Sequence, residues 1–356
     1  MSLNYVLLTG AGFSKNWGGW IANDLWSVIL SHPLTQKNDK LKDSLWSNKE
    51  LGFENIFDDK ALDAKDKADY QQVVIDSFVE MHGVLKSPKF TPDKLSHSFS
   101  IPNTFSDEIM NNFDGFFSLN QDLFFEYLSI KDWAYPYINN ANEIYDIFQN
   151  KKEEIGELKN NLGKMTFTVG TNLTDKTKSK PYYKVHGSLN FKSDNGSNLI
   201  IMGRLKENQI NDYELLKKYR EDFPRILMNA KKLMIVGYSF KDDYINQIIF
   251  DSVMKNNLKI WIIDKSELES LIYNAAQAKF FENNKEFFNE ESYKETKRAQ
   301  FRKKTELEKG ELFRKIYDEL KGYFKQSLIC ISTNNLSIFN TNDLEVSRIN
   351  RYFFDK

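Results

Sequence analysis

The sequence has little cysteine and histidine, the side chains that build most structural zinc sites. One cysteine, Cys330, and four histidines occur in 356 residues. A single cysteine excludes an intramolecular disulfide and any zinc site built from four cysteines. Its position in the apolar run SLICIS favours a buried core thiol over a nucleophile. We expect no bound metal, because three histidines lack ligand spacing and are interpreted as structural or exposed: His32, His82 and His97.

An excess of charge and a long apolar run are absent as well. The 49 basic and 50 acidic residues leave a formal net charge of -1. No overall field would therefore attract nucleic acid or an anionic membrane. No run is long enough to span a bilayer, and the one ending at Leu8 is too short for a signal peptide. We predict a cytoplasmic protein without direct membrane or nucleic-acid binding.

Short apolar runs that end in small or polar residues are abundant. Between them, apolar residues recur at helical spacing, so strands and helices alternate along the chain. This alternation predicts an α/β fold, a Rossmann-like and mostly parallel sheet with helices on both faces. The predicted strands cover residues 3–9, 116–119, 165–169, 182–185, 231–236, 259–263 and 328–332.

Residues 31–112 interrupt this alternation, and we interpret them as a mostly helical insertion. Residues 1–282 then form one domain that carries the insertion. Residues 283–356 form a charged helical segment, a last strand and a tail packed on the domain or on a partner. A solvated helix pair is favoured there over a basic nucleic-acid patch at 297–304. The aromatic tail 348–354 is a candidate anchor for a partner.

The first strand runs into a loop of small residues and then into a helix predicted over residues 14–30. Such a turn directs backbone N–H groups and the helix dipole at one point, where a pyrophosphate can bind. The same turn also serves plain strand-to-helix packing, so the loop alone leaves both interpretations open. The loop consists of Gly10, Ala11, Gly12, Phe13 and Ser14.

Four further strands end in residues suited to binding. Ligands of open parallel sheets lie beyond the carboxyl ends of the strands, so these ends are expected to meet at one site. Asn120 has the alternative of capping a helix, and His186 that of a turn residue. The ends carry Asn120-Gln121-Asp122, His186-Gly187, Gly237-Tyr238-Ser239 and Asp264.

In order and placement these motifs resemble the sirtuin superfamily, more closely its bacterial NAD-cleaving branch than the protein deacylases. The resemblance covers roughly residues 1–30, 113–130, 165–190 and 230–265. It implies that Gly10, Ala11, Gly12, Phe13 and Ser14 surround the pyrophosphate of NAD+, which is the substrate. It also implies that Asn120 and Asp122 match the family's TQN-x-D segment, with Asn120 near the nicotinamide ribose.

The remaining motifs acquire roles from the same resemblance. His186 would contact the ribose hydroxyls, and Asp264 is expected to accept from the adenosine ribose hydroxyls. Gly237, Tyr238 and Ser239 match the family's segment beside the phosphates and the adenosine ribose.

Three departures separate the sequence from the deacylases. Leu119 replaces the family's glutamine, and Gly18-Gly19-Trp20-Ile21 stands where a Pro-Asp-Phe-Arg stretch would be. The cysteines of the zinc module are missing as well. These changes argue against acyl-lysine recognition and leave the NAD-cleaving residues in place.

We therefore expect an NAD+ glycohydrolase in which Asn120 orients the attacking water and His186 contacts the ribose. The alternatives are an NAD-dependent deacylase and a non-catalytic sensor that binds NAD or ADP-ribose. The resemblance implies antiviral defence by NAD+ depletion, with an Argonaute-type protein or, as first choice, a HerA-type ATPase as partner.

A homo-oligomer is expected for two reasons. A toxic NADase needs a control step, and assembly is a common one. The chain also has 28 Phe and 17 Tyr, and the insertion has apolar faces that one sheet would not cover. Burial of Phe78, Met81 and Leu85 within their own protomer is the alternative.

Overall fold

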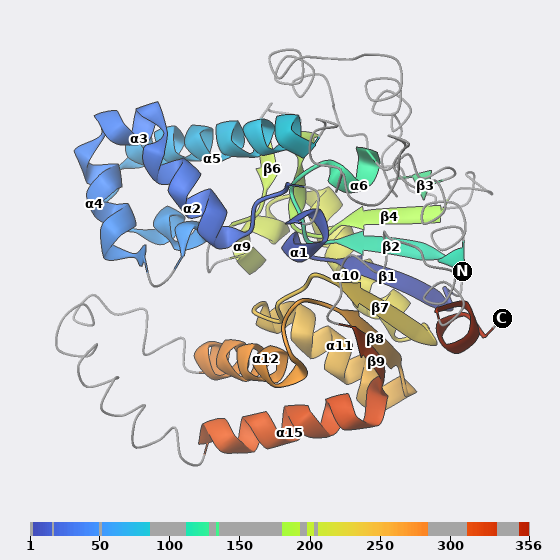
Figure 1. Cartoon of the computed structure of the whole chain (residues 1–356). Coiled ribbons are helices and arrows are strands. Elements are labelled where there is room, and N and C mark those ends of the chain that lie inside the picture. The colour runs from blue at the N-terminus through green and yellow to red at the C-terminus, as the bar shows by residue number, and fades with distance from the viewer. Residues whose placement is uncertain are drawn as a thin grey trace, which may run out of the picture.

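The computed structural model confirms the α/β fold with a Rossmann-like parallel sheet (Figure 1). The strands are ordered β3-β4-β2-β1-β7-β8-β9, and every pairing between them is parallel. Their bounds are β1 Tyr5–Thr9, β2 Gly115–Ser118, β3 Trp133–Ala134, β4 Lys180–Lys184, β7 Lys232–Val236, β8 Lys259–Ile263 and β9 Leu328–Ser332.

The structure describes residues 3–15, 18–49, 52–85, 112–127, 133–134, 180–192, 198–202, 206–283, 312–332 and 349–355. The strand predicted over 165–169, most of the charged segment after 283, and His97 lie outside these residues. In the described ranges, no helix combines the length and the apolar character that crossing a bilayer requires.

Helices cover both faces of the sheet, and the alternation of side chains along β2 and β4 shows how. Phe117 and Tyr183 stack on one face at 4.6 Å, where Phe223 of α10 (Glu214–Leu227) packs on Phe117 at 4.7 Å. On the other face, Phe125 of α6 (Phe124–Tyr127) stacks on Tyr182 at 4.5 Å. Adjacent strand residues thus enter two separate cores, as the pleat of a strand requires.

Three more helices flank the β7–β9 half of the sheet: α11 (Asp243–Asn256), α12 (Leu268–Asn283) and α15 (Leu312–Ser327). The bounds of α11 follow from its sequence. Asp242 caps its N-terminus by accepting from the N–H of Ile245 at 3.3 Å, and Asn257 ends it in the left-handed region at φ +58°.

The chain order places a switch point at the middle of the sheet. After β1 the chain builds β2 and β4 on one side, and it then returns to place β7 on the other side of β1. The loops that follow β1 and β7 therefore leave the sheet side by side at its carboxyl end. In doubly wound sheets such a point forms the ligand crevice.

The described part of the predicted insertion, residues 31–49 and 52–85, is mostly helical. It contains α3 (Pro33–Lys37), α4 (Asp39–Ser47), a 3₁₀ helix (Phe53–Asp58) and α5 (Ala64–Leu85), and α2 (Ala22–Ser31) leads into it. Figure 1 shows these helices in blue beyond the carboxyl ends of the strands. Phe78, Met81 and Leu85 are buried within the chain itself. For these three residues, burial within the protomer is thus the observed alternative.

The single helix predicted over 14–30 is wrong. A short helix α1 (Ala11–Lys15) ends, and α2 starts only at Ala22. Gly18, at φ +93°, and Gly19, whose N–H donates to the Ser14 carbonyl at 2.9 Å, form the turn between them. The positive φ favours glycine at position 18.

The tail was expected to pack on the domain or on a partner, and its described part packs on the domain. Residues Ile349–Phe353 form a π-helical turn that packs on the amino end of the sheet. Phe353 and Phe354 are buried against Tyr5 and Phe113, with ring centroids 5.1–6.0 Å apart. The tail therefore completes the core of its own protomer.

Candidate active site

The loops after β1 and β7 interlock through three glycines. The N–H of Gly10 donates to the Val236 carbonyl, and that of Gly12 to the Gly237 carbonyl, each at 2.9 Å. A Cβ on Gly12 would lie 2.7 Å from Gly237 Cα, and one on Gly237, at φ +64°, would lie 2.3 Å from the Gly12 carbonyl carbon. Glycine is therefore required here so that the two backbones can touch.

This geometry refines the role expected of the glycine loop. The N–H of Gly12 already donates to the Gly237 carbonyl, and the N–H of Phe13 donates to the Gly10 carbonyl at 2.9 Å. The Phe13 ring packs in the core against Phe124 and Phe125, at 5.6 and 6.0 Å. The loop thus lies at the switch point of the sheet, and the buried Phe13 ring leaves only the backbone of that residue to contact a ligand.

Asn120 is bonded directly to this loop. Its side-chain nitrogen donates to the Gly10 carbonyl at 3.0 Å and to the Ser14 hydroxyl at 3.2 Å. The Gly10 carbonyl can only accept, so the amide nitrogen must face it and the orientation of the amide is fixed. Within the described part of the chain, nothing hydrogen-bonds to Asn120 Oδ1. The side chain therefore holds one spare acceptor beside the glycine loop.

Asp122 supports the same cluster from the other side. Its Oδ2 accepts from the Ser14 hydroxyl at 2.9 Å, and its Oδ1 accepts from the N–H of Phe124 at 2.9 Å. The Lys184 ammonium, fully buried at the end of β4, donates to the Asp122 carbonyl. The Asn120–Asp122 loop is thus fixed at both ends, which preorganises Asn120.

His186 is held by an acid that the sequence analysis did not include. His186 Nε2 lies 3.3 Å from Asp242 Oδ2, and both side chains are largely buried, at 7% and 14% exposed. The signal in the sequence was the Lys-Asp-Asp stretch before α11, a pattern typical of a helix N-cap. That pattern predicts that Asp242 caps a helix. It does not predict the contact between Asp242 and His186, which only the folded structure shows.

The Gly237-Tyr238-Ser239 loop supports Asp242. The Tyr238 hydroxyl lies 3.0 Å from the Asp242 carbonyl and 2.7 Å from Asn246 Oδ1. Burial raises the pKa of that hydroxyl well above its ordinary value, so Tyr238 stays neutral and serves as a donor. Ser239 is exposed, and its carbonyl accepts from the Asn274 amide at 2.9 Å.

The loop that carries Asn120 and the loop that carries His186 both bond to the β5–β6 hairpin (Gly187–Lys192 and Asn198–Ile200). The sequence analysis did not predict this hairpin. The Leu189 N–H donates to the Gln121 carbonyl at 2.9 Å, and the Ile201 N–H donates to the His186 carbonyl at 3.0 Å. The loops that carry Asn120 and His186 are therefore tied to one hairpin.

Asp264 lies at the carboxyl end of β8, next to β7. It is buried, and its Oδ1 accepts from the N–H of Ser266 at 2.7 Å. Its role toward a ribose stays a prediction.

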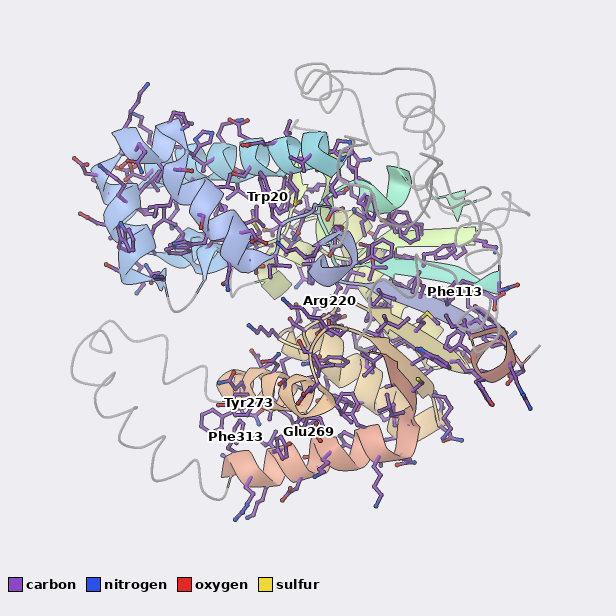
Figure 2. The ribbon with its side chains drawn as sticks, viewed as in Figure 1. Trp20, Phe113, Arg220, Glu269, Tyr273 and Phe313 are labelled. Atoms are coloured by element: carbon purple, nitrogen blue, oxygen red, sulfur yellow. The ribbon has the colours of Figure 1, made fainter. Side chains whose placement is uncertain are left out.

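A separate open hollow of about 760 Å³ lies between α12 and α15 (Figure 2), and its lining contains none of the predicted site residues.

The described residues hold no cluster of three or more potential metal ligands. What the carboxyl end does hold is a glycine interlock, a preorganised amide and a paired histidine at the switch point of a parallel sheet. These features are typical of the nucleotide sites of Rossmann-like proteins.

Comparison with known proteins adds a family. Residues 114–287 match the family described as the SIR2-like domain, which supports the sirtuin-like superfamily and an NAD-related function. The matched range contains Asn120, His186 and Gly237. The glycine loop precedes it, and the fold places that loop among them because β1 pairs with both β2 and β7. No curated protein matches the chain.

Proposed function

We propose that the protein is an NAD+ glycohydrolase that releases nicotinamide and ADP-ribose. The observation that carries the proposal is Asn120, whose two N–H groups are used by the glycine loop while Oδ1 remains free among the described residues. A fixed acceptor beside a nucleotide-type loop suits the orientation of one water molecule against a bound ribose.

The reaction requires little from the protein. The bond between nicotinamide nitrogen and ribose C1′ breaks, and its electron pair neutralises the pyridinium, so no general acid is needed. Water adds to the oxocarbenium-like C1′ and loses a proton, which gives nicotinamide, ADP-ribose and one proton. The protein must therefore hold the ribose, orient the water and accept a proton.

Two side chains meet these needs. Asn120 Oδ1 accepts a hydrogen bond from the water and directs its lone pair at C1′. His186 supplies a ring nitrogen as acceptor for a ribose hydroxyl, since its Nε2 faces Asp242. Gly10, Gly12 and Gly237 form the surface on which the pyrophosphate lies, and Asp264 binds the adenosine ribose. NAD+ is a substrate in this scheme, and no metal takes part.

The biological part of the proposal follows from the toxicity of such an activity. An enzyme that depletes NAD+ harms its own cell unless it is controlled, which suits an effector of antiviral defence. Control by assembly into a homo-oligomer or with a HerA-type ATPase is the form that we propose, and it rests on the resemblance to the bacterial NAD-cleaving branch.

Incubation of the purified protein with NAD+, with and without candidate partners, tests the proposal. Chromatography should show nicotinamide and ADP-ribose appearing in equal amounts, without any peptide. Nicotinamide release that requires an acyl-lysine peptide would identify a deacylase instead. Binding of NAD+ without turnover under every condition would identify a sensor, and either result would contradict the proposal.

A further inference from the structure

Asp242 is held in place independently of His186. One of its carboxylate oxygens, Oδ1, accepts from the Ile245 N–H at the start of α11. Its carbonyl lies 3.0 Å from the Tyr238 hydroxyl. The Asn246 amide, one turn into α11, donates to the Phe240 carbonyl at 2.9 Å and so fixes the loop before the cap. The second oxygen, Oδ2, is thereby fixed at the position where it meets the histidine.

The contact with Oδ2 defines the chemistry of the imidazole. A carboxylate attracts an N–H group and repels a lone pair, so the contact favours the proton on the nitrogen that faces it. In the neutral ring the other nitrogen, Nδ1, is then the acceptor. Among the described residues nothing hydrogen-bonds to Nδ1. The acid therefore selects which ring nitrogen can receive a proton.

We propose that Asp242 is a positioning residue of the active site, which holds His186 in the Nε2–H tautomer and so presents Nδ1 as the acceptor for a ribose hydroxyl. This inference rests on the proposed function for its catalytic consequence, but the pairing itself is testable without any activity. It also assigns a second role to the Gly237-Tyr238-Ser239 loop, because this loop positions Asp242, which orients His186.

The direct test is nitrogen NMR of protein labelled with ¹⁵N-histidine, at a pH above the ordinary histidine pKa of about 6.5. Only four histidines contribute signals, and His186→Ala identifies the one that matters. We expect Nε2 of His186 to carry the proton in the parent protein. In Asp242→Ser, which keeps a good N-cap but is too short to reach the ring, that preference should be lost. An unchanged tautomer in Asp242→Ser would overturn the inference.

The kinetic test separates positioning from structural support. Asp242→Ser and Asp242→Ala both lose the contact with His186, but only the serine retains the cap of α11. We expect both variants to lower kcat about 10- to 100-fold with little change in KM, while Asp242→Ser melts at a higher temperature than Asp242→Ala. Recovery of kcat together with the cap in Asp242→Ser would show a merely structural role and overturn the inference.

Asp243→Asn is the matched control, because it removes the neighbouring carboxylate and leaves Asp242 and His186 unchanged, and it should keep the parent kcat. If the parent protein does not cleave NAD+ at all, the proposed function fails, and the NMR result still decides whether Asp242 sets the tautomer of His186.

Discussion

The two ends of the parallel sheet are built from opposite chemistry, although β1, β2, β7 and β8 run through both. The carboxyl end carries interlocking glycines and buried polar side chains. The amino end carries a cluster of aromatic rings that the tail completes, with Phe353 and Phe354 packed at 5.0 Å from each other and against Tyr5 and Phe113. Rings bury much apolar area and stabilise the fold.

The difference indicates separate roles for the amino and the carboxyl end of the sheet. At the amino end the backbone is satisfied within the protein, as where Asp114 accepts from the N–H groups of Asn4 and Tyr5 at 2.7 and 3.0 Å. At the carboxyl end Asn120 retains an acceptor that no described residue uses. We infer that substitutions at the carboxyl end change activity more than stability, and that substitutions at the amino end do the reverse.

The largest effect is expected at the carboxyl end. Asn120→Ala removes the proposed acceptor for the water, and His186→Ala removes the proposed ribose contact. Each should lower kcat by about 10²–10³ or more, the range for loss of one preorganised group, while circular dichroism stays that of the parent. Two folded variants that cleave NAD+ near the parent rate would disprove the catalytic roles.

The second effect is expected at the amino end. Phe353 is fully buried, so Phe353→Ala should lower the free energy of unfolding by about 3–5 kcal/mol. The rate per folded molecule should not change, because the tail lies at the opposite end of the sheet. Urea titration and nicotinamide release measure the two quantities. A loss of kcat without a loss of stability would remove the distinction between the ends.

The third effect concerns the glycine interlock. Gly12→Val should weaken NAD+ binding, because its side chain would collide with Gly237 and push apart the loops after β1 and β7. Calorimetry in the Asn120→Ala background measures this affinity. Gly322→Val is the matched control, since a Cβ there meets nothing within 4 Å, and it should change stability by only a few tenths of a kcal/mol. Unchanged affinity in Gly12→Val would mean that the loop serves packing alone.

The smallest effect is expected at the rim of the amino end. The Lys232 ammonium, 2.6 Å away, lowers the pKa of the Asp355 carboxyl. A lowered folded-state pKa stabilises the protein above the ordinary aspartate pKa, and this stabilisation is lost as the pH falls through the folded value. Asp355 is mostly exposed, so Asp355→Asn should cost about 0.5 kcal/mol or less near pH 7.

That difference should vanish in acid, where the parent carboxyl is protonated too. Thermal melts of parent and Asp355→Asn across the acid range measure it. A gap that widens as the pH falls would contradict the sign.

Much of this architecture could be predicted from the sequence, because parallel strands buried on both faces are continuous apolar runs. The runs at 231–236 and 259–263 correspond closely to β7 and β8. α10 could also have been predicted, since Leu215, Leu216, Tyr219 and Phe223 recur at helical spacing. The strands β5 and β6 are short, and their pattern of apolar residues is too weak to predict them.

The site was less predictable, for a physical reason. Motifs at strand ends indicate which residues gather at one edge, and Asn120 does contact the glycine loop as that reasoning implies. Side-chain partners depend on how loops fold back, so no pattern in the sequence predicts that Asp242 pairs with His186 or that Lys184 bonds to the Asp122 carbonyl. The burial of the tail likewise depends on a distant aromatic cluster.

The most direct test of the account compares Asn120→Ala with Phe353→Ala in one experiment that records both nicotinamide release and the midpoint of urea unfolding. We predict that Asn120→Ala loses cleavage and lowers the midpoint less than Phe353→Ala does, while Phe353→Ala keeps the rate per folded molecule. Cleavage of NAD+ by folded Asn120→Ala at the parent rate would contradict the claim that the carboxyl end of the sheet is the active site.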